Sequence, residues 1–253
     1  MYRLDRKELK YFVSEAEKAR LIEAFRERMT MDEHADQGQT YPIISQYLDS
    51  DGRQCYWEKA DGLKHRRKLR IRIYGDGSGG VEPTVFLEVK AKSYGRGVKR
   101  RIQLPLHVVE DLSRGDTQSY DALERPDCRA ERMMIAEVRS LVQESGFSAN
   151  MAIRYDRLAF QGCPESADLR ITFDSDVQCR TRSKPLEAGC MDFDHSLLPA
   201  GTSLMEVKFM NGLPLWTVRL FTGLGLRPRS FSKYCTALEQ HDPIVAGSSL
   251  VAR

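Results

Sequence analysis

Charged and hydrophobic residues alternate with a period of two in many short segments of this chain, which is the pattern of β-strands. In KLRIRIY (68–74), Lys68, Arg70 and Arg72 fall on one face and aliphatic side chains on the other. The same pattern predicts strands at RKELKYFV (6–13), TVFLEVKAK (84–92), VKRRIQL (98–104), MAIRYDRLAF (151–160), LRITFDSDVQC (169–179) and TSLMEVKF (202–209).

A few helices are predicted between these strands. Ser14 and Glu17 form a capping box ahead of a helix over about 15–30. A longer helix is predicted over about 128–145, before a stop at Gly146, and a final helix near Ser230. The segments YPIISQYLDS (41–50), QCYWEKA (54–60) and PLWTVRLF (214–221) have no clear type.

The glycine-rich run GDGSGG (75–80) joins two predicted strands. No helix is predicted after it, whereas a phosphate-binding P-loop leads directly into one. We therefore interpret the run as a hairpin loop.

Charged residues share strand faces repeatedly. The sets on one face are Arg6, Glu8 and Lys10; Glu88, Lys90 and Lys92; Lys99 and Arg101; Tyr155 and Arg157; Arg170, Thr172 and Asp174; Glu206 and Lys208. One such strand alone is ordinarily an antiparallel strand half exposed to water. Several rows of lysine and arginine with few carboxylates between them would repel one another, which favours an enclosed anion.

Closing such a sheet into a barrel would turn these rows inward. A barrel of about eight strands has an interior that side chains fill or that holds one small ligand. Basic side chains would neutralise phosphate oxygens, and Glu88 and Glu206 would offer hard oxygen ligands to a divalent cation. Ser232 and Lys233, in the first turn of the last predicted helix, are either a further anion site or a plain N-cap with a solvated lysine.

Composition places the chain among globular proteins. It has 253 residues, of which 41% are hydrophobic and 30% charged, and a net charge of +3. Positive charge is concentrated: seven of the nine residues from Lys64 to Arg72 are Lys, Arg or His. This concentration favours a polyanionic ligand.

Location and thiol chemistry follow from absences in the sequence. The six cysteines lack zinc-type spacing, so we expect free thiols in a reducing compartment. There is no secretory signal and no apolar run of the roughly 20 residues that span a bilayer. We therefore expect a cytoplasmic protein.

Eight motifs resemble those of the triphosphate tunnel metalloenzymes (CYTH-like), and within them the polyphosphate-polymerase domain of the vacuolar transporter chaperone (VTC) complex. In family order they are RKELKYFV, KLRIRIY, FLEVK, GVKRRIQL, RYDRLAF, LRITFD, SLMEVKF and FSKY. The resemblance implies an α+β fold, an antiparallel eight-stranded β-barrel (the triphosphate tunnel) with helices packed outside. This would be a single domain over 1–240, with a flexible tail at 241–253.

The resemblance also implies roles for individual residues. Glu206 would be the principal ligand of Mn²⁺ or Mg²⁺, and Glu88 a weaker metal ligand or a residue that orients basic side chains. Tyr155 and Ser232 would add hydroxyl donors. The phosphate-binding residues would be Lys10, Arg70, Arg72, Lys90, Lys99, Arg157, Arg170, Lys208 and Lys233. We expect the catalytic set to be Arg70, Arg72, Lys90, Arg157, Arg170 and Glu206.

The function implied is transfer of the γ-phosphoryl of ATP to an inorganic polyphosphate or pyrophosphate acceptor, with release of ADP. Hydrolytic relatives typically begin with an ExExK strand, whereas residues 6–10 hold one glutamate, which favours a polymerase. The chain departs from the family at Ser230, where lysine is usual. It lacks the membrane helices of the eukaryotic complex, so coupled translocation would need a separate membrane partner.

Three other functions are considered. A tripolyphosphatase or nucleoside triphosphatase would use the same tunnel with water as the acceptor. A non-catalytic polyphosphate or nucleotide sensor would keep the basic residues and could dispense with Glu206. Nucleic-acid binding through residues 64–72 is disfavoured, because alternate basic residues predict an inward face, and we expect no nucleic-acid partner.

Overall fold

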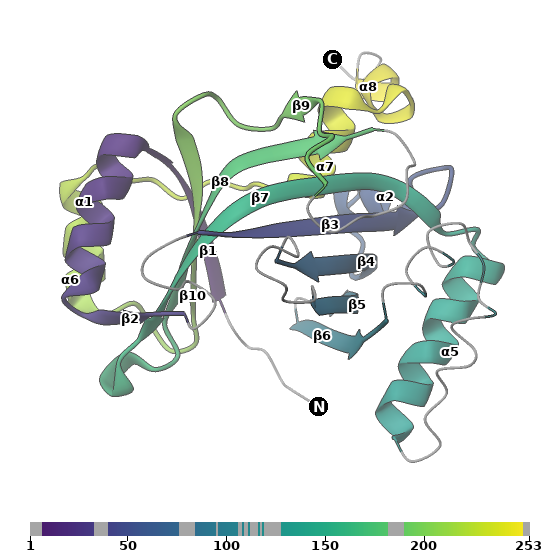
Figure 1. Cartoon of the computed structure of the whole chain (residues 1–253), viewed down its shortest axis with the longest axis horizontal. Helices are drawn as coiled ribbons and strands as arrows, with labels where there is room; N and C mark the ends of the chain where they lie inside the picture. Colours follow the sequence, from purple (N-terminus) through teal and green to yellow (C-terminus); the bar gives the residue numbers. More distant parts are fainter. Residues whose placement is uncertain are drawn as a thin grey trace.

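The computed structural model describes residues 7–32, 40–75, 84–94, 96–105, 128–181 and 190–249, with 108, 111, 116 and 118. One antiparallel sheet forms its centre, and helices lie around it (Figure 1). The neighbouring strands of the main path are β1 (Lys7–Ser14), β10 (Thr202–Phe209), β8 (Arg170–Arg180), β7 (Ser148–Gly162), β3 (Tyr41–Asp49), β4 (His65–Tyr74), β5 (Thr84–Ser93) and β6 (Arg96–Gln103). Two short strands, β2 (Met29–Met31) and β9 (His195–Ser196), pair with β7 and β8.

The two faces of the sheet differ in chemistry, as the alternation predicts. Leu69, Ile71 and Val89 lie on one face and are fully buried. Glu88 and Glu206 lie on the other face and are also buried, although they are charged. A buried carboxylate must be paired, so the charged face needs nearby cations.

The sheet curls around its charged face. Lys90 of β5 experiences the charges of Glu8 and Lys10 in β1 and of Lys208 in β10, although β5 and β1 are far apart in the strand order. The fold is thus the expected α+β tunnel. Within the described ranges no backbone ladder joins β1 to β6, so the eight strands are not closed there by main-chain hydrogen bonds.

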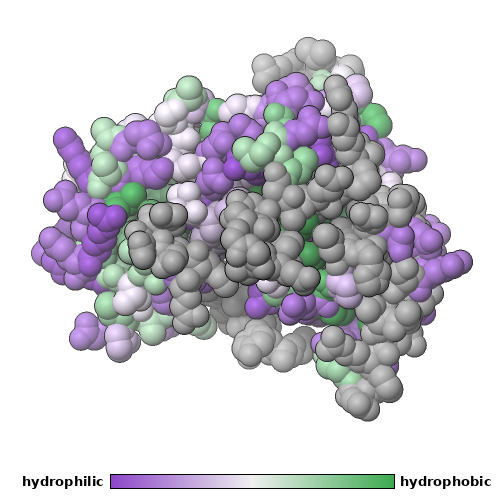
Figure 2. Space-filling view, viewed as in Figure 1, coloured by the Kyte–Doolittle hydropathy of each residue, from purple (hydrophilic) through white to green (hydrophobic). Residues whose placement is uncertain are grey.

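The helices are α1 (Glu15–Arg26), α2 (Gln54–Ala60), α5 (Arg129–Gln143), α6 (Leu215–Gly223), α7 (Lys233–His241) and α8 (Pro243–Ser249), with a 3-10 turn, η3 (Pro164–Ser166). The predicted capping box of Ser14 and Glu17 is present. Helix α1 is shorter than the predicted 15–30, because the chain turns after Arg26 and enters β2 at Met29. Hydrophilic residues cover the α1 side of the molecule, at the left of Figure 2.

The prediction of a flexible tail from residue 241 is wrong for residues 243–249, which form α8. Asp242 Oδ1 accepts hydrogen bonds from the backbone N–H groups of Ile244 (3.0 Å) and Val245 (3.4 Å). Pro243 stands at the first helical position, where its missing N–H costs nothing. Val245 is fully buried, so packing adds to this capping.

Some sequence predictions lie outside the described residues. These are the position of Arg6 and the GDGSGG run apart from Gly75. All six cysteines are described and free, as predicted. Among the described helices none is long and apolar enough to cross a membrane.

Candidate active site

Glu206 of β10 is the centre of the first charged cluster. Its carboxylate oxygens lie 2.9 Å from Lys208 Nζ, 3.3 Å from Lys233 Nζ and 3.4 Å from Lys10 Nζ. Lys10 is there because it stands directly opposite Glu206 in the β1–β10 ladder. Burial alone would raise the pKa of Glu206, but the lysines, with Lys208 foremost, hold it well below its ordinary value.

Asp174 of β8 is the centre of the second cluster and is fully buried. It lies directly opposite Arg157 of β7 and accepts two hydrogen bonds from that guanidinium, at 2.7 and 2.8 Å. Lys233 Nζ lies 2.5 Å from Asp174 Oδ2 and so connects this cluster to Glu206. The ring of Tyr155 packs against both cations, 5.1 Å from Arg157 Cζ and 4.6 Å from Lys233 Nζ.

Glu88 of β5 is the centre of the third cluster. Its Oε2 lies 2.7 Å from Arg70 Nε and 3.9 Å from Arg72 Nε, and its Oε1 pairs with Lys99. Burial alone would raise the pKa of Glu88, but Arg70, Arg72 and Lys99 keep it far below its ordinary value. Because the planar guanidinium of Arg70 holds Oε2 in a fixed geometry, the contacts favour the orienting role that the sequence left open for Glu88.

A tyrosine that the sequence prediction missed adjoins this third cluster. Tyr47 of β3 accepts a hydrogen bond from Arg70 Nη1 (3.2 Å), and its ring stacks on Tyr234 with centroids 4.6 Å apart. Burial alone would raise the pKa of Tyr47, but Arg70, Arg72 and Lys68 bring it down to about 8.

We therefore expect one tyrosine of the folded protein to ionise near pH 8. Because this folded-state pKa lies below the ordinary value of 10.0, ionisation of Tyr47 adds stability that is complete above pH 10.0 and is lost as the pH falls through about 8.

Ultraviolet difference titration should show the ionisation of Tyr47 in the wild type and in Tyr94→Phe but not in Tyr47→Phe. Tripolyphosphate should move it to higher pH by neutralising Arg70; a transition that persists in Tyr47→Phe would refute the assignment.

Glu8 of β1 is a second carboxylate beside Glu206, and the two share their lysines. Lys10 Nζ lies 3.1 Å from Glu8 Oε1, and Lys208 Nζ lies 3.8 Å from Glu8 Oε2. No group of three His, Cys, Asp or Glu residues that could hold a metal occurs in the part of the chain that the structure describes. Mg²⁺ is commonly held by one or two carboxylates together with substrate phosphates, and Glu206 with Glu8 fits that donor set.

Three predicted site residues stand apart from the clusters. Arg170 donates to Asp32 Oδ2 at 2.5 Å, just beyond β2. Lys90 is exposed on the charged face and makes no ion pair with any described residue. Ser232 caps α7, where its hydroxyl accepts hydrogen bonds from the backbone N–H of Cys235 (3.5 Å) and from Lys68 Nζ (3.3 Å).

The sequence prediction assigned no role to four residues that the structure places in or beside the clusters: Glu8, Tyr47, Lys68 and Asp174. The alternation put Glu8, Lys68 and Asp174 on the charged faces, but it could not identify their partners. No signal marked Tyr47, since β3 is buried along nearly its whole length and shows no alternation.

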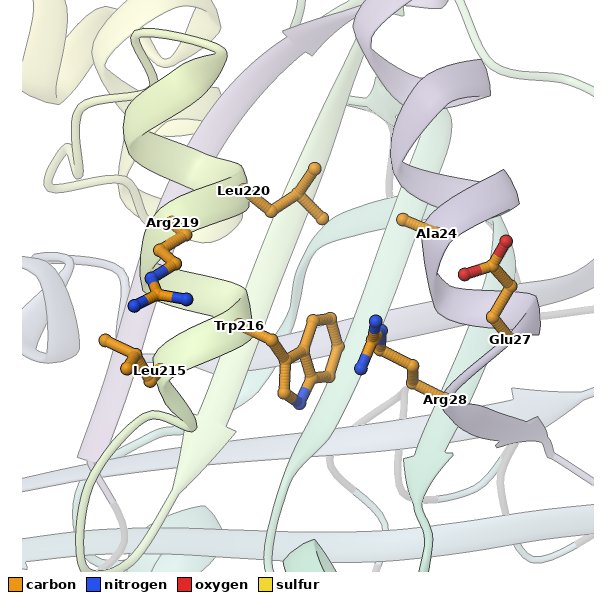
Figure 3. Close-up of a pocket in the computed structure, with 7 residues that line it drawn as sticks. All are labelled: Ala24, Glu27, Arg28, Leu215, Trp216, Arg219 and Leu220. Carbon is orange, nitrogen blue, oxygen red and sulfur yellow. The ribbon is translucent and has the colours of Figure 1, made fainter.

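A pocket of about 440 Å³ lies elsewhere, between α1 and α6. Figure 3 shows Trp216 of α6 facing Arg28, which lies in the turn between α1 and β2 and whose Cζ is 5.7 Å from the indole centroid. The pocket lining shares no residue with the three clusters. None of the predicted phosphate-binding residues lines this pocket.

The chain is similar to known proteins in sequence and in fold. The family model described as the VTC domain matches residues 5–241. The comparison with curated proteins gave no match. Among solved structures, HpAC1 from Hippeastrum, a candidate adenylyl cyclase with a dominant triphosphatase activity, is 14% identical with a TM-score of 0.52, over 92% of this chain and 94% of its own. A candidate adenylate cyclase from Vibrio parahaemolyticus is 11% identical with a TM-score of 0.45, over 95% of this chain and 97% of its own.

Proposed function

We propose that this chain, which belongs to the VTC domain family, is a metal-dependent polyphosphate polymerase that transfers the γ-phosphoryl group of ATP to a growing inorganic polyphosphate chain. The observation that carries the proposal is the excess of cations on the charged face. Lysines and arginines from β1, β4, β6, β7, β10 and α7 surround three buried carboxylates, Glu88, Asp174 and Glu206. A run of phosphates supplies the missing negative charge.

The three carboxylates differ in how firmly they are held. Asp174 and Glu88 pair with planar arginine guanidinium groups, which hold a fixed geometry. Among the described residues, the ion pairs of Glu206 are all with lysines, which are flexible point charges. We infer that phosphate oxygens draw the lysines away from Glu206 when substrate binds, and that Glu206 is then free to bind a metal ion.

Divalent metal use is general in triphosphate tunnel metalloenzymes. In this chain Glu206, with Glu8 beside it, would hold Mn²⁺ or Mg²⁺, and the bound ion would offset negative charge on the phosphate oxygens. Glu88 would orient Arg70, Arg72 and Lys99.

The chemical step needs positioning and charge neutralisation more than covalent help from the protein. A terminal oxygen of the acceptor chain, already ionised, forms the new bond to the γ-phosphorus. The bond from that phosphorus to the β–γ bridging oxygen breaks, and ADP leaves with the electron pair. No proton is transferred, so the chain needs no general base; Arg70, Arg72 and Arg157 stabilise the transferring group.

The test is incubation of the purified protein with ATP and Mn²⁺, following ADP release and product length on a gel. We expect ADP together with phosphate chains longer than any supplied. Free phosphate without chains would indicate a tripolyphosphatase or nucleoside triphosphatase instead. Tight tripolyphosphate binding without turnover would indicate a sensor.

A further inference from the structure

The charged face of β4, β5 and β6 carries a ladder of cations that extends beyond the three clusters. Lys68, Lys90 and Lys99 lie directly opposite one another across the three strands. The next row outward pairs Arg66 with Lys92, and no bulge interrupts the β4–β5 ladder between the rows. Arg66 and Lys92, named the end row below, therefore point to the same face as Arg70.

The end row has no carboxylate to compensate it. Like charges directly opposite on neighbouring strands are destabilising, and neither Arg66 nor Lys92 forms an ion pair with any residue in the described ranges. On the other face of the same strands Arg67 and Arg100 both pair with Glu137 of α5, at 3.8 and 2.5 Å. On the outer face Arg67 and Arg100 thus have a carboxylate partner within the protein, whereas the end row of the inner face has none in the described ranges.

The end of this charged face that lies opposite the end row has a different chemistry. Phe86 stands opposite Arg72 in the ladder, and its ring packs against Arg101 Cζ (4.4 Å) and edge-on against Tyr74 (5.9 Å). The cations at that end, Arg72 and Arg101, each contact an aromatic ring. Along β4 and β5 the charged face therefore changes in character, from aromatic rings near Tyr74 to the cations of the end row.

We propose that Arg66 and Lys92 form a distal subsite for inorganic polyphosphate, so that a long chain leaves the charged face along β4 and β5 toward the end row. The end row lies four residues beyond Arg70, or about 13 Å along the strand. Phosphates of a long chain reach it, whereas tripolyphosphate held by the clusters does not engage it. This inference rests on the proposed polymerase function, because it concerns the path of that enzyme's product.

The test compares binding of long-chain inorganic polyphosphate and of tripolyphosphate to the wild type and to Arg66→Ala/Lys92→Ala. We expect the double variant to bind the long chain about tenfold more weakly and to bind tripolyphosphate unchanged. The dependence of log affinity for the long chain on log salt concentration should become shallower by roughly 1–2. Arg20→Ala/Arg26→Ala on the exposed face of α1 removes the same charge and should change neither affinity.

Two results would overturn the subsite: unchanged long-chain binding by the double variant, or an equal loss for tripolyphosphate. Binding requires no turnover, so this test is separate from the proposed function. Selective loss of long-chain binding in a protein that makes no chains would support the subsite and refute the polymerase. If the wild type makes chains, the double variant should make shorter ones.

Discussion

Glu206→Gln should lower the rate of ADP release from ATP by about 10²–10³ while the protein stays folded. The substitution keeps the shape of the side chain but removes the charge that Lys10, Lys208 and Lys233 surround and that the proposed metal site needs. The rate should be measured across a range of Mn²⁺ concentrations, with circular dichroism to check folding. Tripolyphosphate should bind this variant without metal at least as tightly as it binds the wild type, because the freed lysines attract the anion.

Two further variants make the result for Glu206 specific. Glu23→Gln, on the exposed surface of α1, should leave the rate unchanged. Glu88→Gln should lower the rate but leave the Mn²⁺ concentration for half-maximal activity unaltered, since Glu88 orients Arg70 and Lys99. A Glu206→Gln protein with the wild-type rate and metal dependence would remove Glu206 from the site.

Asp174→Asn should cost about 3–5 kcal/mol of the free energy of unfolding. Asp174 is fully buried, and its loss of charge leaves the cations of Arg157 and Lys233 without their shared partner. Urea denaturation measures the change. Asp176→Asn, two residues along β8, removes the partner of Arg154 at a site where the carboxylate is 49% exposed, and should cost no more than about 1 kcal/mol. Equal effects of the two substitutions would contradict the central role of Asp174.

The contribution of Asp174 to stability should also depend on pH. Burial alone would raise the pKa of Asp174, but Arg157 and Lys233 lower it below its ordinary value of 3.8. The stabilisation from this charge is therefore complete above pH 3.8 and is lost as the pH falls through the folded-state pKa. Tripolyphosphate should restore part of the stability of Asp174→Asn, because it neutralises the same cations.

Much of the site could be predicted from alternation and motif order. The inward face of β4 follows from KLRIRIY alone, because a strand with fully buried aliphatic residues on one side must point its basic residues to the other. The helices α2 and α6 could not be typed in this way. Each is short, and its aromatic and aliphatic residues fit a buried strand as well as a helix.

Partners of the charged residues could not be predicted, because they join segments far apart in the chain. Lys233 meets Asp174 across 59 positions, and Lys68 meets Ser232 across 164. Both contacts depend on where α7 packs against the sheet. The capping of α7 by Ser232 is local and agrees with one of the two interpretations of the sequence. The solvated lysine of that interpretation is wrong, because Lys233 is buried against Asp174 and Glu206.

The sequence by itself determined the alternating strands, the face to which their charges point and the family, because these depend on local periodicity and on the order of motifs. It did not identify β3, which shows no alternation. Only the tertiary structure decided which carboxylate each cation meets. It pairs Asp174 and Glu88 with arginines, pairs Glu206 with lysines and gives the end row no partner among the described residues. The physical reason is that ion pairing depends on distances of a few ångströms between strands, and these are set only when the sheet curls and α7 packs against it.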